Sequence, residues 1–393
     1  MRSAAARTAL LAAALLLAPT PAAAAPAAPP PTVEEARLAE QIPRDILRRS
    51  GFDAHAPALD RALAAAADLP AARAAVHAAG RRLWADAVAR AQGGAGGDLP
   101  AADDRPLYWA RLGLTGAVRQ WRPPYPVEPA RYDELLADLE TTSRGRDTLR
   151  PDLPAGTRRV LVTGFDPFGL DGAVGNSNPS GAAALALDGV TLDTPAGPAR
   201  LETAIFPVRW DDFGAGMVER TLVPSFAAGP QRADLFVTVS QGRPGRFDVE
   251  RYNAAYRGGQ PDNLRVSRKG LIPIPAGVPT VEPQPKRTVT SLPYAALVAA
   301  GTKPFPVYDN TSATDTVGSG GDYLSNEIAY RATLLRDATQ LAAPGGHLHT
   351  PVLAGGAGED PVTGPTLARN RETILGQIRA LLGVALGAPA AGR

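Results

Sequence analysis

The chain reads RRVLVTGFDPFG over residues 158–169, and this stretch decides the fold class of its larger part. An apolar run rich in β-branched residues that ends at a glycine is typical of a strand buried on both faces. Two similar runs follow, LETAIFPV at 201–208 and RADLFVTVSQG at 232–242. Helical patterns separate the runs, and this alternation predicts an α/β fold: a three-layer α/β/α domain with a mostly parallel twisted sheet.

The same alternation continues towards the end of the chain. Residues 323–339 and 366–384 have apolar side chains at helical spacing, and residues 346–351 form a short strand-like run between them. We therefore expect the α/β/α domain to span residues 158–385. Domains of this class bind their ligands beyond the carboxyl ends of the strands.

The residues before this domain read as helices. We expect a helical N-terminal region over 33–150, with Pro43 breaking its first helix and Pro70 dividing the Ala-rich run at 56–91. This region carries no catalytic motif, and its sequence leaves its role open.

The first residues have the pattern of a secretory signal. Arg2 and Arg7 precede an apolar stretch, and small residues near position 25 form a cleavage region. We expect a signal peptide at 1–25, a Pro/Ala-rich spacer at 26–32, and a secreted or extracytoplasmic protein with no stable membrane span. The alternative is an uncleaved membrane anchor.

Charge and composition exclude several classes of function. Without the signal segment the chain has 39 basic and 39 acidic residues, which gives no electrostatic reason to bind nucleic acid. The sequence contains no cysteine, which excludes disulfides, thiolate metal sites and a cysteine nucleophile. We expect no cofactor.

Three segments carry residues suited to catalysis. Phe165 and Phe168 follow a buried strand and can wall a small-ligand pocket. Gln241 ends another strand and precedes Glu250 in TVSQGRPGRFDVERYN (238–253). Ser325 falls in the first turn of the helix predicted after GSGGDY, where free backbone N–H groups can bind an oxyanion.

A late strand adds two histidines, His347 and His349. We take them to alternate between the faces of the strand, so that only one reaches a shared site and no metal is held. Glu250, Ser325 and His349 then supply an orienting carboxylate, a nucleophile and a base. Spacing alone does not single out this triad, because Ser, His and Glu occur together in most proteins.

Five motifs, in order, resemble those of pyroglutamyl peptidase I, the pyrrolidone-carboxylate peptidases. They are TGFDPFG (163–169) with Asn178-Pro179-Ser180, Ser240-Gln241, Glu250-Arg251 with PDN (261–263), SGGDYLSN (319–326), and His349-Thr350-Pro351. The resemblance implies an α/β/α domain that removes N-terminal pyroglutamate from peptides. It implies catalytic roles for Glu250 and His349, and a substrate pocket at Phe165, Phe168, Asn178 and Gln241.

The chain also departs from this family. Ser325 stands where the family has its catalytic cysteine, so His349 must take the hydroxyl proton during attack. An arginine that the family carries before its PDN motif is Gly259 here, with Arg257 as the nearest substitute. Residues 311–318 look inserted just before the nucleophile.

Three hypotheses stay open at this point. The first is a serine-dependent peptidase whose substrate is a small peptide with an N-terminal pyroglutamate. The second is a catalytically inactive relative that binds a pyroglutamyl group, a similar small ligand or a protein partner. The third is a hydrolase of another small amide, with the 311–318 loop changing its specificity.

Overall fold

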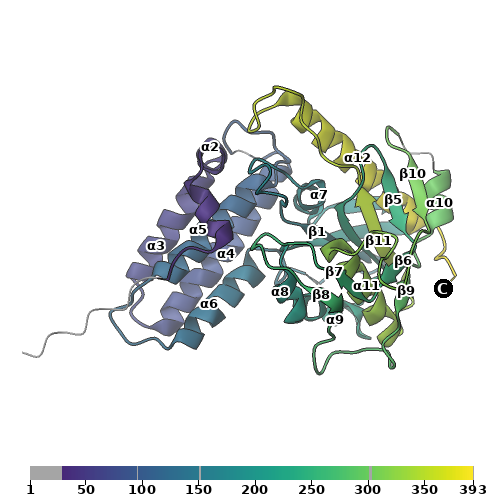
Figure 1. Ribbon diagram of the computed structural model, residues 1–393, viewed down its shortest axis with the longest axis horizontal. Helices are drawn as coiled ribbons and strands as arrows, with labels where there is room; N and C mark the ends of the chain where they lie inside the picture. The colour runs from purple at the N-terminus through teal and green to yellow at the C-terminus, as the bar shows by residue number, and fades with distance from the viewer. Residues whose placement is uncertain (1–28, 95, 150–151, 301–302, 393) are drawn as a thin grey trace, which may run out of the picture.

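The computed structural model describes residues 29–94, 96–149, 152–300 and 303–392, so the predicted signal peptide lies outside the described residues. A helical part comes first in the chain and an α/β part follows it; Figure 1 shows the two side by side. The helical part comprises α1 (Val33–Ala36), η1 (Arg37–Ala39), α2 (Gln41–Ser50), η2 (Phe52–Ala54), α3 (His55–Ala64), α4 (Leu69–Ala91), α5 (Arg105–Gln120) and α6 (Pro129–Thr142).

The two prolines of the helical part behave differently. Pro70 lies in the first turn of α4, after a break at 65–68, as predicted. The prediction for Pro43 is wrong, because Pro43 lies in the first turn of α2 and the chain bends earlier, at 37–40. A proline is tolerated in a first turn because the N–H that it lacks has no partner within the helix there.

The α/β part is built on a seven-stranded sheet in the order β10-β5-β11-β4-β1-β3-β2. Four neighbouring strands, β11, β4, β1 and β3, are parallel, whereas β5 is antiparallel to β11 and β2 is antiparallel to β3. The sheet strands are β1 (Arg158–Phe165), β2 (Thr191–Thr194), β3 (Gly197–Phe206), β4 (Leu235–Gln241), β5 (Phe247–Glu250), β10 (Val307–Asn310) and β11 (Gly345–Thr350). The sheet is thus mostly parallel, as the sequence predicts.

Helices cover both faces of this sheet and complete the three layers. One face, with Leu161 and Phe236, packs against α8, α9 and α11; the opposite face, with Val237, packs against α7, α10 and α12. These helices are α7 (Pro179–Leu187), α8 (Trp210–Gly214), α9 (Met217–Phe226), α10 (Tyr294–Ala299), α11 (Leu324–Ala338) and α12 (Pro365–Gly387). Alternate residues of each strand face opposite layers, which explains the near-continuous apolar runs in the sequence.

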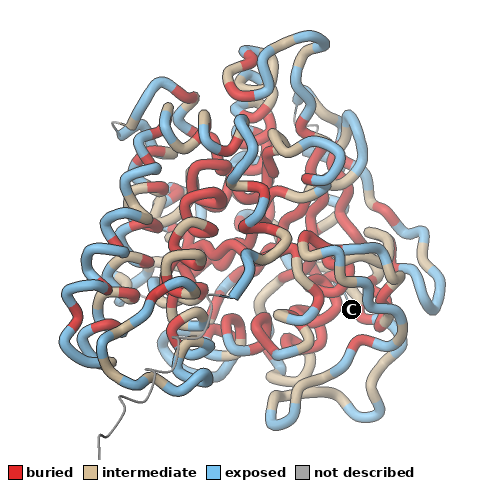
Figure 2. The backbone as a smooth tube through the Cα atoms, turned by 60° about the vertical axis from the view of Figure 1, so that its left-hand side comes forward, coloured by how far each residue is buried: buried red, intermediate tan, exposed pale blue. Residues whose placement is uncertain are grey.

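Two small ladders lie outside the main sheet: β6 (Tyr252–Ala254) pairs with β9 (Arg287–Val289), and β7 (Tyr256–Gly258) pairs with β8 (Lys269–Leu271). The helical part packs against α7 and β3, where Trp84, Leu107 and Leu185 share one buried cluster. Buried segments run through both parts in Figure 2. The helical part therefore shares a hydrophobic core with the α/β part.

Candidate active site

A cavity of about 340 Å³ lies where β1, β4 and β11 end. This is the edge at which parallel α/β sheets bind ligands. All seven residues singled out from the sequence line it: Phe165, Phe168, Asn178, Gln241, Glu250, Ser325 and His349. The fold thus brings together four segments that are separated by as many as 184 positions in the chain, from Phe165 to His349.

His349 and Glu250 form a buried pair in the lining of the cavity. The Nδ1 atom of His349 lies 2.6 Å from Oε1 of Glu250. The carboxylate makes Nδ1 the protonated nitrogen, which leaves Nε2 as the one that can accept a proton. The other carboxylate oxygen, Oε2, accepts a hydrogen bond from Nδ2 of Asn310 at 2.9 Å.

Asn310 was not among the residues singled out from the sequence. Its Nδ2 also donates to the carbonyl of Ser319 at 2.7 Å, so one amide group ties Glu250 to the segment that leads into α11. The only sequence signal is its place at the end of a strand, next to the 311–318 segment. Asn310 fixes the orientation of Glu250 and, through it, the ring of His349.

Two glycines make room for the His349 side chain. A Cβ atom on Gly242 would lie 2.6 Å from Cβ of His349, and one on Gly320 would lie 2.7 Å from its Cε1. Separations below 3.0 Å are not tolerated between real Cβ atoms and their neighbours. The histidine is therefore held between two backbone segments that only glycine allows to approach so closely.

Ser325 occupies the second position of α11, whose N-cap is Tyr323. Its Oγ donates to the carbonyl of Gly320 at 3.5 Å, the outer limit of a hydrogen bond. Among the described residues, no hydrogen bond joins Ser325 to His349. The first N–H groups of α11 have no carbonyl partner within the helix, so they can meet a negative oxygen in the cavity.

The prediction that His347 and His349 point to opposite faces is wrong. Residues two positions apart on a strand share a face, and the two rings lie edge to face with centroids 4.7 Å apart. His347 is fully buried, and its two nitrogens lie 2.8 Å from the hydroxyls of Thr238 and Ser240. Burial, and then the neighbouring His349, hold the pKa of His347 well below 6.5.

Because the two histidines share a face of the strand, their orientation does not exclude a metal between them. Both ring nitrogens of His347 and the Nδ1 atom of His349 are, however, engaged by protein groups. Within the part of the chain that the structure describes, no group of three or more His, Asp and Glu side chains is arranged to hold a metal ion. The same described residues include no helix that is both long and apolar enough to cross a membrane.

Asn178 and Gln241, the polar side chains of the predicted pocket, both make hydrogen bonds within the protein. Asn178 caps α7, because its Oδ1 accepts from the N–H and the hydroxyl of Ser180 while its Nδ2 donates to the Asp166 carbonyl. Gln241 accepts from the N–H of Leu353 through its Oε1. Asn178 thus shapes the wall of the cavity with its side-chain atoms already engaged.

Arg257 does not enter the cavity. Its guanidinium makes two 2.6 Å hydrogen bonds to Glu327 on α11 and lies over the ring of Trp210. The arginine that lines the cavity is Arg243, next to Gly242. Arg257, the nearest substitute in the sequence for the family's arginine, is thus not an arginine of the cavity, and Arg243 was not singled out from the sequence.

The helical part holds the loop that carries Phe165 and Phe168. Asp166 in this loop accepts two 2.9 Å hydrogen bonds from Arg111 of α5 and one of 2.7 Å from Arg144, which follows α6. All three side chains are buried. A buried carboxylate between two arginines is stable only while both partners stay in place, so this contact couples the two parts of the chain.

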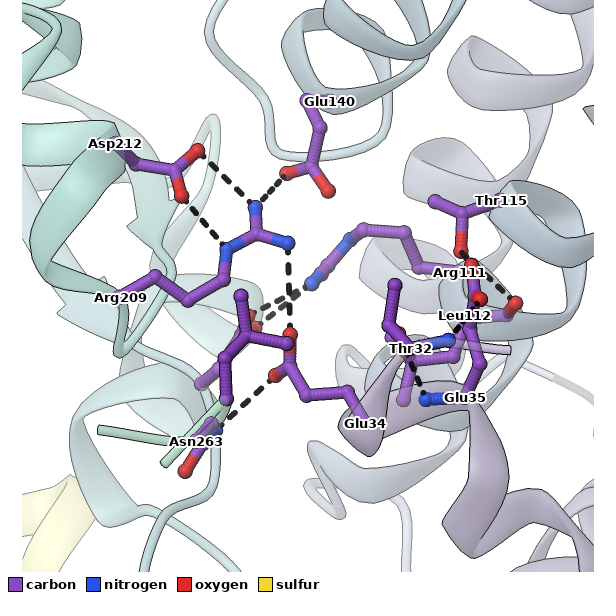
Figure 3. A network of polar contacts seen from close by, with 12 residues as sticks. Thr32, Glu34, Glu35, Arg111, Leu112, Thr115, Glu140, Arg209, Asp212 and Asn263 are labelled. Carbon is purple, nitrogen blue, oxygen red and sulfur yellow. Dashed lines mark hydrogen bonds and ion pairs between the residues drawn. The ribbon is translucent and has the colours of Figure 1, made fainter. Parts of the chain in front are cut away.

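A second set of contacts continues this link. Arg209, which precedes α8, is paired with Glu34 of α1, Glu140 of α6 and Asp212 of α8 (Figure 3). Asn263 bonds to Glu34 and to the Pro167 carbonyl in the pocket loop. Burial raises the pKa of Glu34 despite the opposing effect of Arg209.

Asp104, which precedes α5, joins the helical part to the other end of the pocket loop, at Ser177 and Asn178. Its Oδ2 accepts from the N–H of Asn178 at 2.8 Å, and its Oδ1 accepts from the hydroxyl of Ser177. Burial raises the pKa of Asp104 to about 6. The helical part, which carries no catalytic motif, therefore holds both ends of the loop that walls the cavity.

Comparison with known proteins supplies the family. The family described as "PA0049 N-terminal domain" matches residues 17–140, and "PA0049, C-terminal domain" matches 159–302 and 286–354. The uncharacterized protein PA0049 of Pseudomonas aeruginosa is 32% identical over an alignment that covers 89% of this chain and 85% of that protein.

Similar solved structures are more distant. Two are of Bacillus amyloliquefaciens pyroglutamyl peptidase I, at 21% and 20% identity, covering 58% and 60% of this chain and 97% and 99% of those chains, with TM-scores of 0.42 and 0.46. A Campylobacter jejuni 5'-methylthioadenosine/S-adenosyl homocysteine nucleosidase matches at 12% identity over 57% of this chain and 99% of that one, with a TM-score of 0.30. Similarity this weak carries no functional argument, so function must be argued from the residues of the site.

Proposed function

This chain belongs to the PA0049 family, and from the chemistry of its cavity we propose that it is a serine-dependent hydrolase that removes an N-terminal pyroglutamate from peptides. One observation carries the proposal: Ser325, in the first turn of α11, lines the same cavity as the buried His349–Glu250 pair. The pyroglutamyl-peptidase motifs in the sequence support the choice of substrate.

The proposed reaction begins with attack of the Ser325 hydroxyl on the amide carbonyl that follows the pyroglutamyl ring. His349 takes the hydroxyl proton on Nε2, and Glu250 stabilises the resulting imidazolium through Nδ1. Backbone N–H groups at the start of α11 stabilise the oxyanion. His349 then gives its proton to the departing amine, and water hydrolyses the acyl-enzyme by the same steps in reverse order.

The walls of the cavity suit a small, neutral lactam ring. Phe165 and Phe168 supply apolar surface to the lining, while Gln241 supplies a polar side chain. Pockets for small molecules combine an apolar lining with a few polar groups in this way.

The N-terminal signal pattern leads us to propose that the enzyme works outside the cytoplasm. In an oxidising compartment a catalytic thiol is open to oxidation, whereas a serine is not. This difference gives a physical reason for serine at position 325 in a chain without cysteine.

A second candidate is a protein that binds pyroglutamyl ligands without cleaving them. Ser325 is bonded to the Gly320 carbonyl rather than to His349, and this observation favours it. A serine is not ionised in advance by a neighbouring imidazole as a cysteine is, so a poor serine–histidine geometry leaves it inert.

Turnover of a fluorogenic L-pyroglutamyl amide tests the choice between these candidates. The purified chain and its Ser325→Ala and Ser325→Cys variants are measured side by side, with folding checked by circular dichroism. Release of the fluorophore by the natural protein, abolished in Ser325→Ala, is the expected result. Binding without release by the natural protein, with activity only in Ser325→Cys, would establish the second candidate.

A further inference from the structure

Arg243 is the cation in the lining of the catalytic cavity that lies outside the proposed machinery. It immediately follows Gly242, whose backbone packs against His349, so its main chain lies next to the reacting groups. Half of its side chain is exposed. An arginine in this place can reach a ligand without first breaking a buried structure.

The charges around Arg243 are not balanced. Arg243 and Arg246 both contact the buried Asp248, at 3.4 Å and 3.1 Å. Within the described part of the chain, no other carboxylate lies within ion-pair distance of either arginine. Arg246 is also held over the ring of Tyr308, 5.0 Å from its centroid. The carboxylate of Asp248 is therefore shared by two guanidinium groups, and Arg243 makes the longer of the two contacts.

The other described residues that line the cavity supply no free carboxylate that would compete with a ligand for Arg243. Glu250 is engaged by His349 and Asn310, and Ser240 is bonded to His347. The other lining residues are apolar or neutral. A half-exposed guanidinium with spare N–H donors in the lining of such a cavity is a receptor for a carboxylate.

We infer that Arg243 selects substrates that carry a carboxylate on the residue released by cleavage. This inference rests on the proposed function, because the pyroglutamyl ring itself has no charge and any carboxylate must belong to the departing part. The carboxylate of an acidic side chain and the terminal carboxylate of a dipeptide share this chemistry. Arg243 thus acts on specificity, while Phe165 and Phe168 supply the apolar surface for the acyl group.

Three ligands separate these sources: L-pyroglutamyl-L-glutamine amide, L-pyroglutamyl-L-glutamic acid α-amide, and L-pyroglutamyl-L-glutamine with a free terminus. The first two differ only in the side-chain charge. Their affinities for the Ser325→Ala protein are measured by titration calorimetry, so that binding is read without turnover. We expect one or both carboxylate ligands to bind about fivefold more tightly than the neutral amide, the scale of a partly exposed ion pair.

Replacing the arginine makes the test specific. Ser325→Ala combined with Arg243→Gln should bind all three ligands equally, and with Arg243→Glu it should prefer the neutral amide. Arg268→Gln, at an exposed arginine paired with Asp211 on the surface, is the matched control and should keep the preference. Added salt should weaken the preference for carboxylate ligands in the Ser325→Ala protein that keeps Arg243, and should not change the binding pattern when Arg243 is replaced by Gln.

Several outcomes would overturn the inference. Equal binding of the three ligands to the Ser325→Ala protein would do so, as would a preference that survives in Arg243→Gln. A uniform loss of affinity or turnover in Arg243→Gln would assign the arginine to the common acyl group or to the oxyanion instead. Preferential binding of carboxylates without turnover by the natural protein would refute the proposed hydrolysis and leave the role of Arg243 standing.

Discussion

Replacing Gly320 by alanine should displace the proposed base without changing any group that takes part in the reaction. The new Cβ would lie 2.7 Å from Cε1 of His349 and 3.2 Å from Cγ of Glu250. Ordinary contact begins at 3.4 Å, so the imidazole must move by about 0.7 Å. Gly320 does not have a left-handed backbone conformation, so alanine adds no backbone strain there.

The expected consequence is a large loss of turnover with a small loss of stability. Misplacing a catalytic group by about 1 Å costs roughly 100-fold in rate, and overpacking a buried site costs about 1–3 kcal/mol. We therefore expect kcat on the fluorogenic pyroglutamyl amide to fall roughly 100-fold, while the far-ultraviolet circular dichroism stays unchanged. The ring signals of His349 in ¹⁵N-labelled protein should shift, which gives a readout that does not depend on activity.

Gly355→Ala is the matched control. Gly355 also lies in a loop, and a Cβ there would have an ordinary contact of 3.8 Å with Leu367. A kcat of Gly320→Ala within twofold of that of the natural protein, or an equal loss of activity in Gly355→Ala, would refute the role of Gly320 in positioning His349. Unchanged His349 signals in Gly320→Ala would equally show that the ring is not confined as described.

Three further predictions concern residues around the site. Asp166→Asn leaves Arg111 and Arg144 without their shared charge, so we expect a loss of about 3–5 kcal/mol in the free energy of unfolding by urea; a loss below 1 kcal/mol would show that the loop is not held through this carboxylate. His347 resists protonation when folded but is protonated below about pH 6.5 when unfolded, so its stabilising contribution is complete above that pH and is lost as the pH falls, by at most about 1.4 kcal/mol per unit. Urea denaturation between pH 4.5 and 7.5 should show a shallower decline below pH 6.5 for His347→Asn, and parallel curves for the two proteins would count against a buried neutral imidazole. Asn310→Ala removes one hydrogen bond to Glu250, and we expect kcat to fall about tenfold with KM little changed; a change confined to KM would assign Asn310 to substrate binding instead.

Much of the α/β part could be predicted because its elements are decided locally. The strands at 158–165 and 235–241 are apolar runs ended by loop residues, and α11 and α12 have apolar residues at helical spacing. Parallel strands place their carboxyl ends together, which is why two residues that end such strands, Phe165 and Gln241, lie at one edge of the sheet.

Other features depend on contacts that no local pattern encodes. Glu250 lies on β5, which is antiparallel to β11, and nothing in the residues of β5 specifies that strand direction. Asn310 acquires its role only because β10 lies beside β5, 60 positions away in the sequence. The face of His347 was a different matter: it follows from the two-residue period of a strand and was predicted wrongly.

The contacts by which the helical part holds the pocket loop could not be predicted from local sequence patterns either. Arg111 is one of many arginines in an Ala- and Arg-rich sequence, and Asp166 looks like a polar loop residue. Only the packing of α5 against the α/β part buries the two side chains against each other. A buried ion pair between distant segments can be recognised only when the fold shows that these segments are in contact.

The central claim, that Ser325 is a nucleophile activated by His349, is tested most directly by covalent labelling with a fluorophosphonate that reacts with activated serines. Intact-protein mass spectrometry of the full chain should show one added label, and peptide mapping should place it on Ser325. The label should be absent in Ser325→Ala and much slower to form in His349→Ala, with folding of both variants checked by circular dichroism. A natural protein that stays unlabelled, or a label that persists in Ser325→Ala, would contradict the claim.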